Sequence, residues 1–185
     1  SESGYDAVSA TVYGGLGDDT LLFTGTPNNT TVWGGGDLVT TTDGSDSIYF
    51  ATSVSALEIQ GNAGNDTLNI ASVVKGGSYV RGGKDNDDIS ISSSVTSSTV
   101  YGNLGKDSLT IGNKFTNATV YGGSPADTTA DGADSIYIAG AVSKSYAQAN
   151  AGNDTLFMAG AIESSTIYAG AGDDLVTASS TIKTV

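Results

Sequence analysis

The chain has 185 residues, of which 26 are glycine and two are proline, and its formal net charge is −13. It contains no histidine and no cysteine, which excludes disulfides, thiol chemistry and Ser-His or Cys-His nucleophiles, and seven Lys and Arg are too few for a nucleic-acid-binding face. We therefore expect neither an enzyme nor a nucleic-acid-binding protein.

The chain begins with a partial glycine turn, Gly4–Asp6, followed by too few residues for a full coil. Residues 1–12 therefore predict a degenerate first coil. Because the chain also stops in the middle of a coil, at Thr184-Val185, we expect it to be a piece of a longer protein. No apolar run reaches the length of a transmembrane helix.

From residue 14 onward, a glycine-rich turn recurs, and each copy closes on an aspartate. Gly14–Asp19 is the first of eight copies, and Gly34–Asp46 and Gly122–Asp134 are the two longer ones. The copies begin at positions 14, 34, 61, 82, 102, 122, 149 and 169, so the spacing is 20 or 21 residues once seven are subtracted for each long copy. Repeats of this length are the signature of a solenoid.

The repeats form a larger unit that is duplicated. Residues Trp33–Phe50 align without a gap on Tyr121–Ile138, 88 residues later. We therefore expect a single solenoid domain made of two four-coil units, 13–100 and 101–185.

Apolar residues occupy three kinds of position in each coil. Two of them, spaced two residues apart, follow each turn, as Leu68 and Ile70 do, and this period of two predicts a strand. A second strand precedes the turn, marked by Ile59 or Val80, and one apolar residue such as Val74 recurs between the two strands. Stacked coils would align these side chains as ladders in a narrow core.

The turn motif resembles the RTX nonapeptide, Gly-Gly-x-Gly-x-Asp-x-U-x, in which U is a large apolar residue. The resemblance covers nearly the whole chain and implies an all-β fold: a right-handed parallel β-solenoid of the RTX β-roll type. We expect about eight coils of 20–21 residues with two 7-residue inserts. In this chain the motif occurs once per coil, Asp85 replaces the third glycine, and Ala149 and Ala169 replace the first.

The resemblance implies Ca²⁺ along one edge of the solenoid, with about seven ions in one row between the eight turns. All seventeen aspartates fall in the turns, the inserts or the partial turn, whereas Glu occurs only three times. Turn carbonyls and closing aspartates would supply the six or seven hard oxygens that Ca²⁺ prefers, and Mg²⁺ fits less well. The expected metal residues are Gly17, Asp18, Asp19, Asp43, Gly44, Asp46, Gly64, Asp66, Asp85, Asp87, Gly105, Asp107, Asp131, Gly132, Asp134, Gly152, Asp154, Gly172, Asp173 and Asp174.

Two further features leave alternatives open. The inserts Gly36–Asp43 and Ser124–Asp131 add Asp37 and Asp127, and each insert forms an additional ion site, a lateral contact with another subunit, or a plain surface loop. A stripe of outward residues precedes the turns, and it either binds sugar or protein or packs as a ladder on the sheet. The stripe consists of Tyr13, Trp33, Gln60, Arg81, Tyr101, Tyr121, Gln148 and Tyr168.

The composition and the resemblance favour a calcium-binding structural segment of a bacterial cell-surface protein, similar to surface-layer proteins. It would fold on meeting Ca²⁺ outside the cell, and its expected partners are copies of itself or neighbouring domains of the same parent protein. The alternative is a stalk or folding module of a secreted RTX adhesin, toxin or enzyme. An ice-binding β-roll is disfavoured because its threonine column is interrupted by Glu58, Tyr79 and Tyr146.

Overall fold

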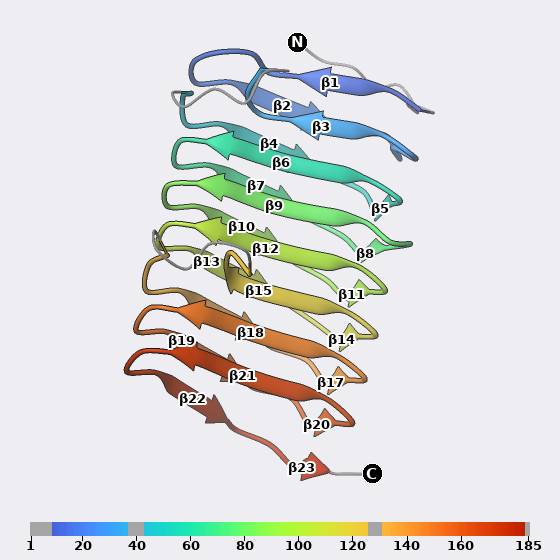
Figure 1. Ribbon diagram of the computed structural model, residues 1–185. Helices are drawn as coiled ribbons and strands as arrows, with labels where there is room; N and C mark the ends of the chain where they lie inside the picture. The colour runs from blue at the N-terminus through green and yellow to red at the C-terminus, as the bar shows by residue number, and fades with distance from the viewer. Residues whose placement is uncertain (1–8, 37–42, 126–130, 184–185) are drawn as a thin grey trace.

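The computed structural model describes residues 9–36, 43–125 and 131–183. Every strand pair in it is parallel, and no helix occurs among the described residues. The strands form three sheets that run the length of a β-solenoid, with one strand of each sheet contributed by almost every coil (Figure 1). This confirms the predicted all-β solenoid of about eight coils.

The first sheet, called here the pre-turn sheet, carries the strands that lead into the glycine turns. Its strands are regular over their first three residues, where apolar side chains such as Val100 and Val120 pair in register. From β6 onward each strand continues into the first residues of the turn motif. The eight strands are β1 (Thr11–Tyr13), β3 (Thr31–Trp33), β6 (Glu58–Ala63), β9 (Tyr79–Lys84), β12 (Thr99–Leu104), β15 (Thr119–Gly123), β18 (Tyr146–Ala151) and β21 (Thr166–Ala171).

The second sheet, the post-turn sheet, follows the turns and shows the predicted alternation. In β7, for example, Leu68 and Ile70 are buried while Thr67 faces solvent. One exception to the sequence interpretation is Asp88, which we placed in a turn but which begins β10. The strands are β2 (Thr20–Phe23), β4 (Ser47–Phe50), β7 (Thr67–Ile70), β10 (Asp88–Ile91), β13 (Ser108–Ile111), β16 (Ser135–Ile138), β19 (Thr155–Met158) and β22 (Leu175–Ala178).

The third sheet, the short-strand sheet, was not predicted. Each of its strands has only two residues, so no alternation could reveal it, and the sequence showed one recurring apolar residue in its place. That residue is the buried first residue of the strand, as Val74 and Phe115 are. The strands are β5 (Val54–Ser55), β8 (Val74–Lys75), β11 (Val95–Thr96), β14 (Phe115–Thr116), β17 (Val142–Ser143), β20 (Ile162–Glu163) and β23 (Ile182–Lys183).

The core lies between the three sheets and consists of ladders of apolar side chains, one rung per coil. Ile59, Leu68, Ile70, Val74 and most of their equivalents are fully buried. Fully burying such a side chain is worth about 1.5–3 kcal/mol, so each coil contributes several such increments when it stacks on its neighbour. The β-branched residues that dominate the ladders suit a pleated, buried surface.

A buried hydroxyl ladder closes the corner between the short-strand sheet and the pre-turn sheet. The backbone N–H of Ser78 donates to Ser98 Oγ at 3.2 Å, and that hydroxyl donates to the carbonyl of Thr96 at 3.0 Å. Ser145 makes equivalent bonds, and it accepts from the N–H of Ala118. This corner is therefore held by neutral hydrogen bonds, whereas carboxylates hold the corner at the glycine turns.

Candidate metal centre

The short turns obtain their tight shape from two residues with positive φ, at the second and fourth motif positions. In the third copy these are Asn62 at 90° and Gly64 at 115°. A Cβ on Gly64 would lie 2.0 Å from the carbonyl oxygen of Gly44, so the fourth-position backbones of successive coils approach too closely for a side chain. Asp85 occupies that position with φ at 72°, which Asp tolerates better than most residues.

The fourth motif position forms a column along the turn edge, and the glycines expected as metal residues lie in it. Its carbonyl oxygens face the next coil: a Cβ on Gly105 would lie 2.0 Å from Asp85 O, and a Cβ on Gly152 would lie 1.9 Å from Gly132 O. Backbone oxygens therefore recur at a constant place from turn to turn. The column consists of Gly17, Gly44, Gly64, Asp85, Gly105, Gly132, Gly152 and Gly172.

The closing aspartates form a second column, linked from coil to coil by hydrogen bonds. The backbone N–H of Asp46 donates to Asp66 Oδ1 at 2.8 Å, and the N–H of Asp66 donates to Asp87 Oδ1 at the same distance. The seven bonds of this kind all measure 2.8 or 2.9 Å. The column runs through Asp19, Asp46, Asp66, Asp87, Asp107, Asp134, Asp154 and Asp174.

The second carboxyl oxygen of the six inner aspartates is buried and has no hydrogen-bond partner. These atoms are Oδ2 of Asp46, Asp66, Asp87, Asp107, Asp134 and Asp154. Asp19 and Asp174, in the first and last turns, are only half-buried. A buried carboxylate oxygen without a partner is costly, so a row of six indicates a cation that the protein atoms alone do not supply.

The first glycine of each turn makes room for this orphaned oxygen. A Cβ on Gly61 would lie 2.1 Å from Asp66 Oδ2 and 2.6 Å from the carbonyl oxygen of Gly82, in the next coil. At Gly34, the corresponding distances are 2.2 Å to Asp46 Oδ2 and 2.7 Å to Gly61 O. The missing side chain thus leaves a space bordered by one carboxylate oxygen and one carbonyl oxygen in each of these coils.

Burial raises the pKa of these carboxyl groups, and neighbouring carboxylates raise it further, while the N–H from the preceding coil lowers it. The pKa of Asp87 rises to about 9, and that of Asp134 to about 8. Asp66 and Asp107 are raised to about 7 and Asp46 to about 6, and the pKa of Asp154 is also raised. A row of carboxyl groups that resists ionisation when alone would ionise readily beside a divalent cation.

A third ladder, at the fifth motif position, was missed by the sequence analysis. Here the hydrogen bonds run in the opposite direction: the N–H of Asn86 donates to Asn65 Oδ1 at 2.9 Å, and the N–H of Lys106 donates to Asn86 Oδ1 at 2.8 Å. Asp18 and Asp173 belong to this exposed column and not to the buried one: Asp18 Oδ1 accepts from Ser45, and Asp173 donates its N–H to Asn153. Side-chain amides at this position in three of the turns, Asn65, Asn86 and Asn153, were the signal that could have revealed it.

The inserts contribute one described aspartate each, at equivalent places. Asp43 Oδ1 accepts from the N–H of Gly44 at 2.9 Å, and its Oδ2 is buried without a partner. Asp131 accepts from Gly132 through Oδ1 and from Ala151 through Oδ2, both at 3.2 Å. Asp37 and Asp127 lie outside the described residues, so the role predicted for them stays a prediction.

The outward stripe makes the side-by-side contacts predicted for ladder packing. Tyr101 and Tyr121 stack with ring centroids 5.1 Å apart, and Tyr13 meets the edge of Trp33 at 5.2 Å. Arg81 lies 5.3 Å from the Tyr101 ring centroid and forms an ion pair with Glu58 at 2.7 Å.

The donors on this edge suit a hard divalent cation. Within the described ranges no three carboxylates converge, so an ion here would need backbone carbonyls as well as aspartate oxygens. Both are present in each of these turns, the carboxylate oxygen is orphaned, and Ca²⁺ accepts mixed carboxylate and carbonyl sets of this kind. The residues therefore fit Ca²⁺.

Comparison with known families supports this fit. The model of the RTX calcium-binding nonapeptide repeat (4 copies) matches residues 11–22, 58–69 and 160–180. In these three stretches the chain is similar to RTX calcium-binding repeats. No curated protein and no solved structure matches it significantly. The three matched stretches contain turns of the aspartate column, so the RTX solenoid here is a structural module whose repeats bind calcium.

Proposed function

We propose that this RTX solenoid is a structural segment of a bacterial cell-surface protein that is stabilised by bound calcium, similar in role to a segment of a surface-layer protein. Inside a cell, where free Ca²⁺ is scarce, the acidic turns would oppose folding; outside, Ca²⁺ would bind between successive turns and lock the coils together. RTX repeats occur in secreted bacterial proteins, which supports an extracellular location. The described residues include no helix of the length and apolarity that crossing a membrane requires.

The observation that carries this proposal is the row of buried, unpartnered aspartate Oδ2 atoms. When ionised, six such carboxylates in one column would repel each other. Each would also lose its hydration on burial, so the calcium-free folded state is destabilised. In the bound state Ca²⁺ would supply the missing positive charge, held by the closing aspartates and by turn carbonyls. Binding energy then becomes folding energy, as in other metal-dependent domains.

The solenoid fold suits the proposed structural role because it forms an elongated body. Strands pair only with the coils before and after, so the body can be long without a large core, and its stability is shared between coils and their interfaces. Self-association, or contact with neighbouring domains of the same parent protein, would extend this body into a layer. The two four-coil units, 13–100 and 101–185, are part of the same proposal.

The test is far-UV circular dichroism of the chelated protein during a Ca²⁺ titration, with Mg²⁺ at the same ionic strength as control. We expect a cooperative transition from coil to β-structure with Ca²⁺ and a much weaker response to Mg²⁺. A β spectrum that chelator leaves unchanged would contradict calcium-dependent folding outside the cell, because the apolar ladders would then be enough to fold the chain without metal. Analytical ultracentrifugation on the calcium-loaded protein separately tests self-association.

A further inference from the structure

Two hollows open on the outward face of the pre-turn sheet; the first is lined by Gly36 and Ser124, one residue from each insert, and the second by Pro125 of the second insert. The first has a volume of ≈330 Å³ and is lined by Trp33, Gln60, Asn62, Gly83 and Asn103, among others. The second has a volume of ≈570 Å³. Both volumes lie in the range of about 300–1,000 Å³ that is typical of small-molecule sites.

The two hollows share a duplicated set of lining residues. Five residues of each lining correspond through the internal duplication, with an offset of 88, or of 87 after the one-residue difference in coil length, whereas Asn103 lines only the first hollow and Tyr168 only the second. An aromatic residue, a glutamine, an asparagine, an alanine and a glycine recur at the same places. The pairs are Trp33 and Tyr121, Gln60 and Gln148, Asn62 and Asn150, Ala63 and Ala151, and Gly83 and Gly170.

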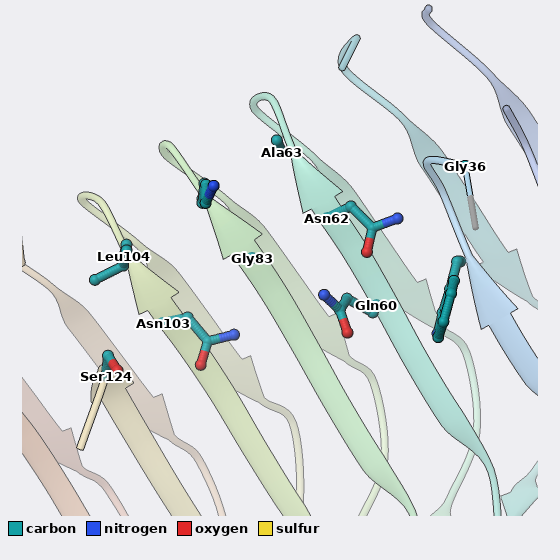
Figure 2. Close-up of a pocket in the computed structure, with 10 residues that line it drawn as sticks. Gly36, Gln60, Asn62, Ala63, Gly83, Asn103, Leu104 and Ser124 are labelled. Carbon is teal, nitrogen blue, oxygen red and sulfur yellow. The ribbon is translucent and has the colours of Figure 1, made fainter. Parts of the chain in front are cut away.

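In the first hollow, side-chain amides surround a stretch of backbone at Gly83, which has no side chain. Gln60 and Asn62 project from β6 and Asn103 from β12, with Gly83 of β9 between them (Figure 2). Gly83 pairs with Asn62 on one side and with Asn103 on the other, and because it has no side chain, the space between the two asparagines is unfilled. The side-chain amides of Gln60, Asn62 and Asn103 make no hydrogen bond to any described residue. Each therefore offers a donor and an acceptor to a ligand.

The second hollow holds its amides in fixed orientations. The hydroxyl of Tyr146 donates to Gln148 Oε1, which leaves the NH₂ of Gln148 without an acceptor among the described residues. Asn150 is only 5% exposed, and its Nδ2 donates to the carbonyl of Gly123 at 2.6 Å. The two amides thus present fixed groups at the lining, which lowers the entropy lost on binding.

An aromatic ring bounds each hollow and is braced from the preceding coil. Trp33 is contacted by Tyr13, and Tyr121 is stacked on Tyr101. On its other side each ring is followed in register by the glutamine of the hollow, Gln60 or Gln148. The ring is thus supported from behind, and its amide neighbour lies toward the hollow.

The charge of the lining selects a neutral ligand. Among the lining residues that the structure describes, none is acidic, and Lys84 in the first hollow is the one cation. The chain as a whole carries −13, which repels anionic ligands, and a cation would be drawn instead to the turn carboxylates. Aromatic rings beside amide groups complement a molecule with C–H faces and neighbouring hydroxyls.

We propose that the two hollows are repeated binding sites for a neutral oligosaccharide, with a sugar ring against Trp33 or Tyr121 and its hydroxyls on the Gln and Asn amides. The sites lie four coils apart, roughly 19 Å at the usual strand spacing. One glycan chain could therefore engage both, and the second contact would strengthen the first without any new interaction. This inference is independent of calcium binding by the aspartate column.

The experiment uses the calcium-loaded protein and neutral hexasaccharides of glucose, mannose and N-acetylglucosamine, with heparin as an anionic probe. Trp33 is the only tryptophan, so its fluorescence reports on the first hollow alone, while calorimetry counts both sites. We expect two sites for at least one neutral hexasaccharide and a change in Trp33 emission. Gln60→Ala should weaken binding at the first site about tenfold and remove the emission change. Gln148→Ala should remove the second site and keep the emission change.

Asn69→Ala is the matched control, because Asn69 is an amide on β7 in the post-turn sheet, away from both hollows. It should bind like the unmodified protein, and unchanged circular dichroism should show that all three variants fold. The proposal is overturned if no neutral hexasaccharide binds, if heparin alone binds, or if Gln60→Ala and Gln148→Ala bind as tightly as Asn69→Ala. It is equally overturned if the two glutamine variants abolish self-association instead, because a second copy of the chain would then occupy the hollows.

Discussion

The backbone N–H of Asp66 donates to Oδ1 of Asp87, 2.8 Å away in the next coil. This bond occupies one oxygen of the Asp87 carboxyl group and leaves Oδ2 buried without a partner. One side chain thus serves two purposes: Oδ1 ties coil to coil, and Oδ2 offers a charge to a cation. The following predictions separate these two purposes.

Asp87→Asn should change stability in opposite directions with and without calcium. The variant keeps the Oδ1 acceptor for Asp66 but removes the acidic oxygen. Without Ca²⁺ at pH 5, where protonation of the other turn carboxyls favours the folded chain, we expect unfolding to cost about 1–3 kcal/mol more than for the unmodified protein, because position 87 no longer has to hold a proton. That is a rise in Tm of about 2–4 °C per kcal/mol for a chain of this size. With Ca²⁺ the variant should melt lower. Asp88→Asn, at the exposed start of β10, is the control, and equal shifts in both variants would contradict the assignment.

The calcium-free protein should lose stability as the pH rises. The folded-state pKa values of about 6 to 9 lie above the ordinary value of 3.8, so the folded state binds more protons than the unfolded state between these limits. The associated stability is complete below about pH 4. For each carboxyl it then falls by about 1.4 kcal/mol per pH unit until the pH reaches the folded-state pKa of that group, so the whole loss is complete above about pH 9. In chelator, urea unfolding at pH 4 and pH 5, together with the β-structure content seen by circular dichroism as the pH is raised to 9, measures it. The calcium-loaded protein should show the reverse trend, because Ca²⁺ competes with protons; a flat profile in chelator argues against buried carboxyls.

Gly82→Ala should disturb the aspartate column directly. The added Cβ would lie 2.2 Å from Asp87 Oδ2 and 2.8 Å from Asp87 Cβ, so the carboxyl must move. We expect a loss of about 1–3 kcal/mol in the free energy of unfolding and a higher Ca²⁺ midpoint in the circular dichroism titration. Gly36→Ala, where no atom of the described residues lies within 4 Å of the added carbon, should leave both unchanged. If Gly82→Ala binds Ca²⁺ with the unmodified midpoint, the space beside Asp87 is not part of the site.

Ser98→Ala should destabilise the solenoid equally with and without calcium. The substitution leaves the N–H of Ser78 buried without its acceptor, at the corner formed by the hydroxyl ladder. We expect a loss of about 1–3 kcal/mol in urea unfolding both with Ca²⁺ and in chelator at pH 5, where the calcium-free chain is folded. Ser90→Ala, in the middle of β10 with no such bond, is the control. A loss seen only in the presence of Ca²⁺ would show that the two corners are coupled.

Much of the architecture could be predicted because each repeat is locally consistent. The constant 20–21-residue spacing sets the coil length, and the period of two in stretches such as Leu68–Ile70 sets the post-turn strands. The aspartates that close the turns stand at one motif position, so a solenoid must stack them in one column. The inserts showed as excursions from that spacing, although Asp37 and Asp127 lie outside the described residues and their role stays a prediction.

The sequence by itself determined the coil, the two long strands and the column of aspartates, because these follow from spacing within one repeat. Only the tertiary structure decided which atoms of those aspartates remain available, since Oδ1 of Asp87 is taken by a residue 21 positions earlier in the chain. The tertiary structure likewise decided three other features: the third sheet with its two-residue strands, the hydroxyl ladder at Ser98, and the hollows at Gln60 and Gln148. Each arises from contacts between stacked coils, and such contacts leave no pattern inside a single repeat.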